Sequence, residues 1–372
     1  MAELYCKGCG ALLQQVNKTL PGYVADNINL HDDAKPVLCQ RCFRLRHYSD
    51  VITYSVTNDE YATVINRIKE ENALIVKVVD IFDYSGSFVP AIKRLTGNED
   101  VILVGNKMDL LPKNVKDDKI LNWLKQMLAM EGFTVLDSIL ISAKFGDNFD
   151  RLMAMIEKHK GNRNVYIVGS INVGKSRIVN QILKRYLGYP TDVVTVSPTP
   201  GTTIGMIGFP LLDGTMIYDT PGVINKHQYT HYLTRPSYKI TVPKKEIKPL
   251  VFQLSEGQTL FFGGLARLDV INGETGDKVN LVTYFANTVN IHRTKTDRAE
   301  ELYESKLYTL LSPPFSKDEN LPKWVFHEFK IRDNLKYDIV FSGLGFVTIR
   351  APFYIRAHAP FVVGIYARPA II

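Results

Sequence analysis

The sequence predicts an α/β domain with a parallel sheet, preceded by a short cysteine-rich segment and followed by a mostly β region. Three observations lead to this prediction. Between residues 51 and 223, short runs of β-branched residues alternate with amphipathic stretches, which is the pattern of a parallel α/β sheet. All four cysteines lie within the first 50 residues. From 224 to 372 the helical pattern thins, and aromatic and β-branched runs separated by glycine turns dominate.

A chain of 372 residues is longer than one ordinary domain core, so the sequence predicts two or three domains. We expect a cysteine-rich segment at 1–50, an α/β domain at 51–223 and a mostly β domain at 224–372. No stretch of 18 uninterrupted apolar residues occurs, and the first residues lack the apolar run of a signal peptide. We therefore expect a cytoplasmic protein without membrane association. We also expect a monomer, a state that the sequence itself leaves open.

The net charge of +7 is distributed unevenly along the chain. Residues 224–372 contain 20 Lys and Arg against 14 Asp and Glu, whereas residues 51–223 contain 19 of each. A basic region attracts phosphate-rich partners such as RNA, because bound phosphates release their counterions. The excess is small enough to be an ordinary solvated surface as well, so charge alone leaves both interpretations open.

The cysteines form two Cys-x-x-Cys pairs, Cys6 with Cys9 and Cys39 with Cys42. Each pair can place two thiolates on one side of a turn, and two pairs complete the tetrahedral sulfur shell that Zn²⁺ accepts. The alternative is two disulfides, which a reducing cytosol disfavours. Four protein ligands leave no open position for a reactive water, so we expect a structural zinc site.

Five strands are expected in the α/β domain, at 73–79, 101–105, 138–142, 165–169 and 215–219. The last four run directly into motifs that are rich in glycine or polar residues. Ligands of open α/β sheets bind at the carboxyl ends of the strands. Motifs that are scattered along the sequence can therefore converge on one site.

The segment "GSINVGKS" at 169–176 matches the G-x-x-x-x-G-K-S phosphate loop between a strand and a helix. Its glycines let backbone N–H groups surround phosphates at a helix N-terminus. We expect Lys175 to bridge β- and γ-phosphate oxygens and Ser176 to ligate Mg²⁺. The predicted phosphate-contacting residues are Gly169, Ser170, Ile171, Asn172, Val173, Gly174, Lys175 and Ser176.

The segment "DTPG" at 219–222 ends another expected strand and follows the phosphate loop, with "TPGTT" at 199–203 between them. We expect Asp219 to hold Mg²⁺ and the Gly222 N–H to sense the γ-phosphate. Thr202 or Thr203 is the candidate switch threonine that reaches Mg²⁺ when triphosphate is bound. The sequence leaves the choice between these two threonines open.

The segment "NKMD" at 106–109 follows the expected strand 101–105. The Asp109 carboxylate can accept hydrogen bonds from the guanine N1–H and 2-amino group, which adenine does not offer, so the motif selects GTP over ATP. Asn106 is expected to brace the loop, and the Lys107 stem to cover the ring. Further along, the Ser142, Ala143 and Lys144 triplet is expected to supply the Ala143 N–H to the guanine carbonyl oxygen.

Together these are the five motifs of a P-loop GTPase in rotated order, because the guanine motifs precede the phosphate loop. A permutation of this kind leaves the site intact where the original termini lie close together. With its cysteine pairs and C-terminal extension, the chain resembles the circularly permuted GTPases of the YqeH family over its whole length. The resemblance implies GTP and GDP as ligands and a role in assembly of the small ribosomal subunit, with the subunit or its precursor, rRNA or a ribosomal protein as partner.

Two positions bear on the rate of hydrolysis. Val223 stands where many GTPases place a glutamine that orients the attacking water, so we expect slow intrinsic turnover. Asn172 gives the phosphate loop the form G-x-x-N-x-G-K-S, which resembles the loops of GTPases that recruit K⁺. The cation could neutralise charge in the transition state. Asn172 could equally do no more than brace the loop.

The rotation places the expected switch segment directly before residues 224–372. We expect nucleotide state to reposition this C-terminal region, for which the sequence predicts a mostly antiparallel β module that binds RNA or protein. The main alternative is an RNA-binding scaffold that holds guanine nucleotide with negligible turnover, and Val223 keeps this alternative open.

Overall fold

The computed structural model describes most of the chain from residue 70 onward. The described ranges are 70–88, 100–188, 206–272, 278–319 and 321–372, together with residues 4, 13–16, 22–25, 37, 39, 40 and 68. None of the helices within these ranges has the length and apolar character needed to cross a bilayer.

The chain packs into two compact units that do not follow sequence order. The first contains residues 1–80, 88–106 and 129–224, and the second contains 81–87, 107–128 and 225–372. Two short pieces of the expected α/β domain therefore belong to the same unit as the C-terminal region.

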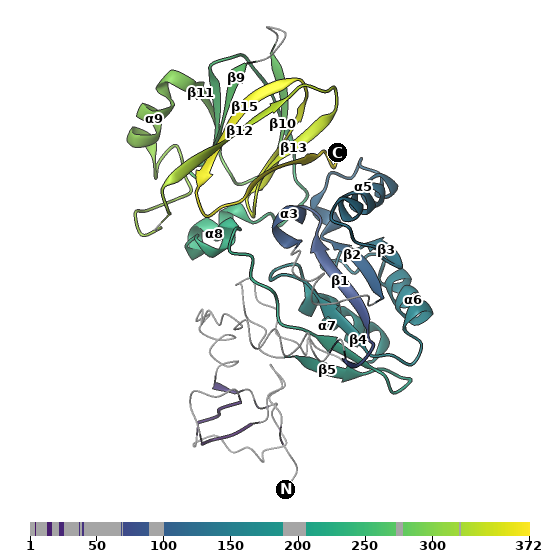
Figure 1. Ribbon diagram of the computed structural model, residues 1–372. Helices are drawn as coiled ribbons and strands as arrows, with labels where there is room; N and C mark the ends of the chain where they lie inside the picture. Colours follow the sequence, from purple (N-terminus) through teal and green to yellow (C-terminus); the bar gives the residue numbers. More distant parts are fainter. Residues whose placement is uncertain are drawn as a thin grey trace. The chain divides into compact units, whose positions relative to one another are not determined.

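A six-stranded sheet forms the centre of the first unit (Figure 1). Its strands lie in the order β3-β2-β1-β4-β6-β5. All neighbours are parallel except β5, which pairs antiparallel with β6 at one edge. The bounds are β1 Leu74–Asp80, β2 Val101–Asn106, β3 Asp137–Leu140, β4 Val165–Val168, β5 Ile207–Pro210 and β6 Met216–Asp219. The five expected strands are confirmed, and β5 was not expected.

Apolar side chains cover both faces of this sheet. On one face, Leu74, Val76 and Val78 of β1 pack in a cluster with residues of helices α6 (Phe149–Lys160) and α7 (Lys175–Tyr186). On the other face, Ile75 packs in a second cluster with residues of neighbouring strands. Because successive side chains of a strand point to opposite faces, a strand buried on both sides is a continuous apolar run, which explains why β1 could be found from sequence.

The parallel strands bring the polar motifs to one edge of the sheet. Asn106 ends β2, the phosphate loop follows β4, and Asp219 ends β6. Since β2, β1, β4 and β6 are mutually parallel neighbours, these strand ends share one edge.

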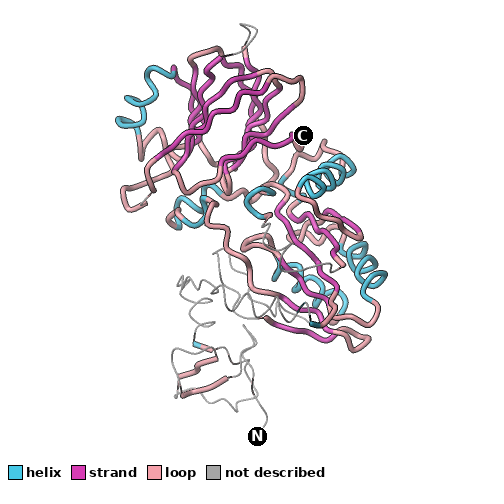
Figure 2. Tube along the Cα trace, viewed as in Figure 1, coloured by secondary structure: helices cyan, strands magenta, loops and turns pink. Residues whose placement is uncertain are grey.

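The second unit contains two five-stranded antiparallel sheets, ordered β16-β13-β14-β10-β7 and β11-β8-β9-β15-β12. Figure 2 shows that strands are the main regular secondary structure of the C-terminal region. The strand bounds are β7 Leu250–Leu254, β8 Gln258–Phe262, β9 Ala266–Asn272, β10 Val279–Phe285, β11 Ile291–Lys295, β12 Trp324–Ile331, β13 Lys336–Phe341, β14 Gly345–Arg350, β15 Phe353–Pro360 and β16 Ile365–Pro369. The expected mostly β, antiparallel module is therefore present.

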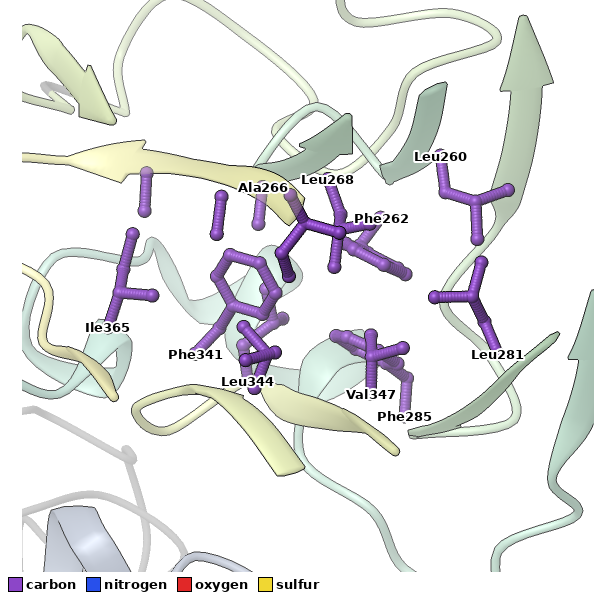
Figure 3. Close-up of a cluster of buried hydrophobic side chains, with 14 of the residues drawn as sticks. Leu260, Phe262, Ala266, Leu268, Leu281, Phe285, Phe341, Leu344, Val347 and Ile365 are labelled. Atoms are coloured by element: carbon purple, nitrogen blue, oxygen red, sulfur yellow. The ribbon is translucent and has the colours of Figure 1, made fainter. Parts of the chain in front are cut away.

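The inner faces of these two sheets share one apolar core. Phe262 of β8, Phe285 of β10 and Phe341 of β13 pack together, with ring centroids 4.2 Å apart for Phe262 and Phe285 (Figure 3). Burying an aromatic or aliphatic side chain of this size contributes about 1.5–3 kcal/mol. The core thus comes from strands far apart in the sequence.

Helical segments complete the second unit. They are α3 (Tyr84–Ser87), η1 (Met108–Leu110), most of α5 (Asp117–Met130), η2 (Tyr229–His231), α8 (Arg235–Thr241), η3 (Thr296–Arg298) and α9 (Ala299–Lys306). The η3 and α9 segments follow each other directly and form one helical stretch that ends at Lys306.

Candidate nucleotide site

The phosphate loop has the backbone shape that its glycines predict. It joins β4 to α7, with positive φ at Asn172 (62°) and Gly174 (98°). A Cβ at Gly169 would lie 2.5 Å from the Val78 carbonyl oxygen, and one at Gly174 would lie 2.4 Å from Asn106 Nδ2. A side chain at 169 would displace the backbone of β1, and one at 174 would be strained by the positive φ and would push the Asn106 amide aside, so both positions favour glycine.

Lys175 is buried within this loop. Its ammonium donates to the carbonyl oxygens of Gly169, at 3.1 Å, and Ser170, at 2.8 Å. Burial lowers the pKa of Lys175 to about 8, although the charge of Asp219 acts in the opposite direction. The amine is thus held where phosphate oxygens of a nucleotide in the loop would meet it.

Asp219 and Ser176 form a second polar pair at the same edge. The Ser176 hydroxyl donates to Asp219 Oδ2 at 2.7 Å. Burial raises the pKa of the Asp219 carboxyl to about 6, while Lys175 and the Ser176 hydrogen bond act to lower it. The other oxygen, Oδ1, is buried without a hydrogen-bond partner among the described residues. A hydroxyl and a carboxylate with an unsatisfied oxygen are ligands that suit Mg²⁺.

The segment after Asp219 lies directly against the phosphate loop. The Val223 N–H donates to the Gly169 carbonyl at 3.2 Å, and the Ile171 N–H donates to the Val223 carbonyl at 3.0 Å. A Cβ at Gly222 would lie 2.6 Å from Ile171 Cγ2 and 2.9 Å from Ile171 N. Glycine at 222 therefore permits a close approach of two backbones.

Asn106 connects the two expected halves of the site within the first unit. Its side-chain amide donates to the Val173 carbonyl at 2.6 Å, and its oxygen accepts from the Ala143 N–H at 2.9 Å. Asn106 thus ties the phosphate loop to the Ser-Ala-Lys segment, as a bracing residue would. The Ala143 N–H, expected to meet the guanine carbonyl oxygen, donates to Asn106 in this structure.

The remaining guanine-motif residues differ in exposure. Ser142 is buried, and its hydroxyl accepts from the Phe145 N–H at 3.3 Å. Lys144 is exposed, with its amine 4.7 Å from the Phe145 ring centroid. Lys107 adopts a left-handed conformation (φ 68°) before η1, and Asp109 lies half-buried in that turn. Asn106 belongs to the first compact unit, whereas Lys107 and Asp109 begin a segment of the second.

Comparison with known proteins finds two family models and several relatives. A family model described as "50S ribosome-binding GTPase" matches residues 164–253, which include the phosphate loop and the 219–222 motif. A model described as "YqeH-like, C-terminal" matches residues 278–371. An uncharacterized protein of Bacillus subtilis (strain 168), YqeH, is 42% identical over 375 residues, which is 100% of both chains.

The chain belongs to the YqeH family. NO-associated protein 1, chloroplastic/mitochondrial, of Arabidopsis thaliana is 30% identical over 391 residues, covering 92% of this chain and 69% of that protein. A crystal structure of GNP-bound YlqF from T. maritima is 19% identical and covers 45% of this chain and 59% of that chain, with a TM-score of 0.29. This YqeH-family protein contains a P-loop GTPase domain in circularly permuted order, with the 106–109 and 142–144 motifs before the matched segment.

Several expected site residues lie outside the described residues. They are both candidate switch threonines, Thr202 and Thr203, and three of the four cysteines, Cys6, Cys9 and Cys42. Cys39 is described and is buried. Within the described ranges, no group of three or more His, Cys, Asp or Glu side chains could hold a metal ion.

The sequence did not predict the residues that hydrogen-bond to the backbone of the guanine motifs. The Gln181 side chain of α7 donates to the Ala143 carbonyl at 3.3 Å. The Ile247 N–H donates to the Leu110 carbonyl at 2.9 Å, immediately after the guanine motif. No local pattern marks either contact, because each depends on segments that are distant in sequence.

Proposed function

We propose that this protein is a GTP-hydrolysing molecular switch that acts in assembly of the small (30S) ribosomal subunit. The observation that carries the proposal is the phosphate loop with the Ser176 and Asp219 pair beside it. A loop of this shape at a helix N-terminus binds phosphate, and a buried carboxylate with an unsatisfied oxygen calls for a cation.

Each residue at the sheet edge has a role in this mechanism. Lys175 contacts the β- and γ-phosphate oxygens, and the Gly222 N–H contacts the γ-phosphate. Mg²⁺ held by Ser176, Asp219 and one of Thr202 and Thr203 would neutralise developing charge on the phosphates. Asp109 accepts hydrogen bonds from guanine, and Asn106 fixes the surrounding loops.

Turnover is expected to be slow without an activator. The Val223 side chain cannot orient a water, and its backbone already pairs with Gly169 and Ile171. We propose Asn172 as a ligand that recruits K⁺, which would substitute for an arginine finger. Hydrolysis that is faster in KCl than in NaCl would support this role, and equal rates would exclude it.

The cysteine pairs are proposed to hold a structural zinc ion. Cys6, Cys9, Cys39 and Cys42 supply four thiolates at the spacing of two zinc knuckles. One equivalent of zinc per chain, lost when the cysteines are replaced by serine, would support the site. Two disulfides in the purified protein would contradict it.

The proposed partner is the small ribosomal subunit or its precursor, recognised through rRNA or a ribosomal protein in the cytoplasm. This part of the proposal rests on family resemblance and on the basic C-terminal region. The matched GTPase family model carries a large-subunit description, so the test must include both subunits.

Co-sedimentation with purified small and large subunits tests the proposal. We expect pelleting with small subunits that is stronger with GTP or a non-hydrolysable analogue than with GDP. Pelleting with large subunits alone would reassign the partner, and no pelleting would contradict the ribosomal role. Nucleotide-independent pelleting without measurable hydrolysis would favour the RNA-binding scaffold, the alternative that Val223 supports.

A further inference from the structure

The segment that follows the guanine motif packs with the C-terminal region. We call residues 106–113 the base loop. From Lys107 onward, the base loop lies in the same compact unit as residues 225–372. The part of the loop that contains Asp109 is therefore supported by the C-terminal half of the chain.

Two hydrogen bonds join the base loop to a short C-terminal segment. The Ile247 N–H donates to the Leu110 carbonyl at 2.9 Å, and Glu246 Oε1 accepts from the Lys113 N–H at 2.9 Å. Ile247 and Leu110 are both buried. The Lys113 and Glu246 side chains are exposed and 3.9 Å apart, so their ion pair adds little. The two backbone N–H bonds are the specific contacts.

This segment, residues 246–248, is anchored in the β module. The Asn287 side chain donates to the Glu246 carbonyl at 2.9 Å and accepts from the Lys248 N–H at 2.8 Å. Asn287 follows β10, whose residues lie in the core of the module. The segment is therefore tied to the β module through the Asn287 side chain.

A second contact fixes the helix that follows the base loop. The Trp123 indole of α5 donates to the Pro369 carbonyl at 2.8 Å. The Arg368 guanidinium carbon lies 4.9 Å from the Trp123 ring centroid. The base loop and α5 are thus held to the C-terminal region at both ends of the stretch 110–123.

We propose that Glu246 and Ile247 are positioning residues that hold the base loop in the conformation in which Asp109 recognises guanine. The inference rests on the proposed function, in which residues 106–109 bind the base. Because GDP and GTP share the base, this support acts on both nucleotides. The C-terminal region then sets how long guanine nucleotide stays bound, separately from any sensing of the γ-phosphate.

Dissociation of fluorescent GDP from the full-length protein tests the proposal. We expect Glu246→Ala to raise the GDP dissociation rate about threefold or more, the effect of losing one ordinary hydrogen bond. Glu246→Gln keeps an oxygen acceptor and should restore the wild-type rate. Lys245→Ala, an exposed neighbouring change, is the matched control and should leave the rate unaltered. Asn287→Ala, which removes both hydrogen bonds between this side chain and the segment, should act like Glu246→Ala.

Inosine diphosphate distinguishes a misplaced Asp109 from a partly unfolded variant. It lacks the 2-amino group that Asp109 is proposed to bind, so a misplaced Asp109 should affect its binding less than the binding of GDP, whereas unfolding should affect both equally. Glu246→Ala should weaken GDP binding more than inosine diphosphate binding, so the preference for GDP falls. Equal weakening of both, or wild-type behaviour of Glu246→Ala, overturns the inference. If the wild-type protein itself fails to prefer GDP over inosine diphosphate and ADP, the proposed function fails instead.

Discussion

Two buried lysines in the first unit have opposite electrostatic surroundings. The Lys77 ammonium of β1 lies 3.7 Å from the Phe88 ring centroid and 4.1 Å from that of Phe133, with no hydrogen-bond partner among the described residues. Burial lowers its pKa to about 7, although Glu131 acts to raise it. Lys160 pairs with Asp213 and Glu157, which outweigh burial and raise its pKa.

Lys77→Met should raise stability at neutral pH. Because the folded pKa lies below the unfolded value, the unfolded chain binds more protons between about pH 7 and 10.5. Wild-type stability should therefore rise through this window relative to the variant, by up to about 1.4 kcal/mol per pH unit. Urea unfolding at pH 7, 8 and 9 measures the difference.

The stability advantage of Lys77→Met should shrink as the pH rises. Parallel stability curves for the two proteins would contradict the assignment. Lys160→Met is the matched control, since it also removes a buried lysine amine. It should lower stability at pH 7, because it leaves Asp213 and Glu157 without their cation.

At the scale of the element, β16 is held by a buried ion pair. The Arg368 Nε lies 3.4 Å from Asp338 Oδ2 of β13, and both side chains are almost fully buried. Burial raises the pKa of the Asp338 carboxyl, and Arg368 acts to lower it. The guanidinium carbon also lies 4.9 Å from the Trp123 ring centroid and 5.3 Å from the Phe346 ring centroid. One side chain thus joins the last strand to α5.

Arg368→Met should destabilise the protein by about 3–5 kcal/mol, because it leaves a buried carboxylate without its cation. Adding Asp338→Asn should recover part of this loss, since a neutral amide can still accept from the Thr348 hydroxyl. Urea unfolding of the two single variants and the double variant gives the coupling energy. Additive losses would show that the pair contributes nothing beyond packing.

The strands that could be predicted are those with a strong apolar pattern. Runs such as 73–79 and 101–105 are buried on both faces, so composition alone marks them. Strand β5 was missed because Ile207–Pro210 is short, ends in proline and lies at a sheet edge. Strand β15 alternates buried and half-buried residues, with Arg356 and His358 at half-buried positions, so it lacks the continuous apolar run that marks β1.

The backbone shape of the candidate phosphate loop was predictable, because phosphate binding restricts which residues can stand there. Phosphate binding at a helix N-terminus requires residues such as Gly174 and Lys175, and in the structure both lie at the start of α7, where the expected loop ends. The support of the base loop was not predictable, because a backbone N–H of Ile247 carries no signature in its side chain. Contacts of this kind depend on how segments distant in sequence pack.

At the scale of the whole molecule, the permutation makes the link between the motifs and the C-terminal region very short. Val223 pairs with the phosphate loop, and Asn225 already belongs to the second unit, where its side chain donates to the Gly86 carbonyl at 2.8 Å. Ile224 alone separates these two attachments. A rearrangement of Gly222 on γ-phosphate binding would therefore be transmitted through the backbone.

The affinity of the protein for the small subunit should consequently differ between its GTP-analogue-bound and GDP-bound forms by about 5- to 150-fold, or about 1–3 kcal/mol. Inserting a flexible Gly-Ser segment between Ile224 and Asn225 should abolish this difference while leaving GDP affinity near wild type, because the base loop keeps its support from Glu246 and Ile247. Titrating the protein with small subunits in the presence of each nucleotide measures the difference in affinity.

The same insertion between Glu256 and Gly257, in the exposed turn before β8, is the control and should leave this difference in affinity intact. If the insertion after Ile224 preserves the difference, the coupling does not run through this link and must pass through packed surfaces instead.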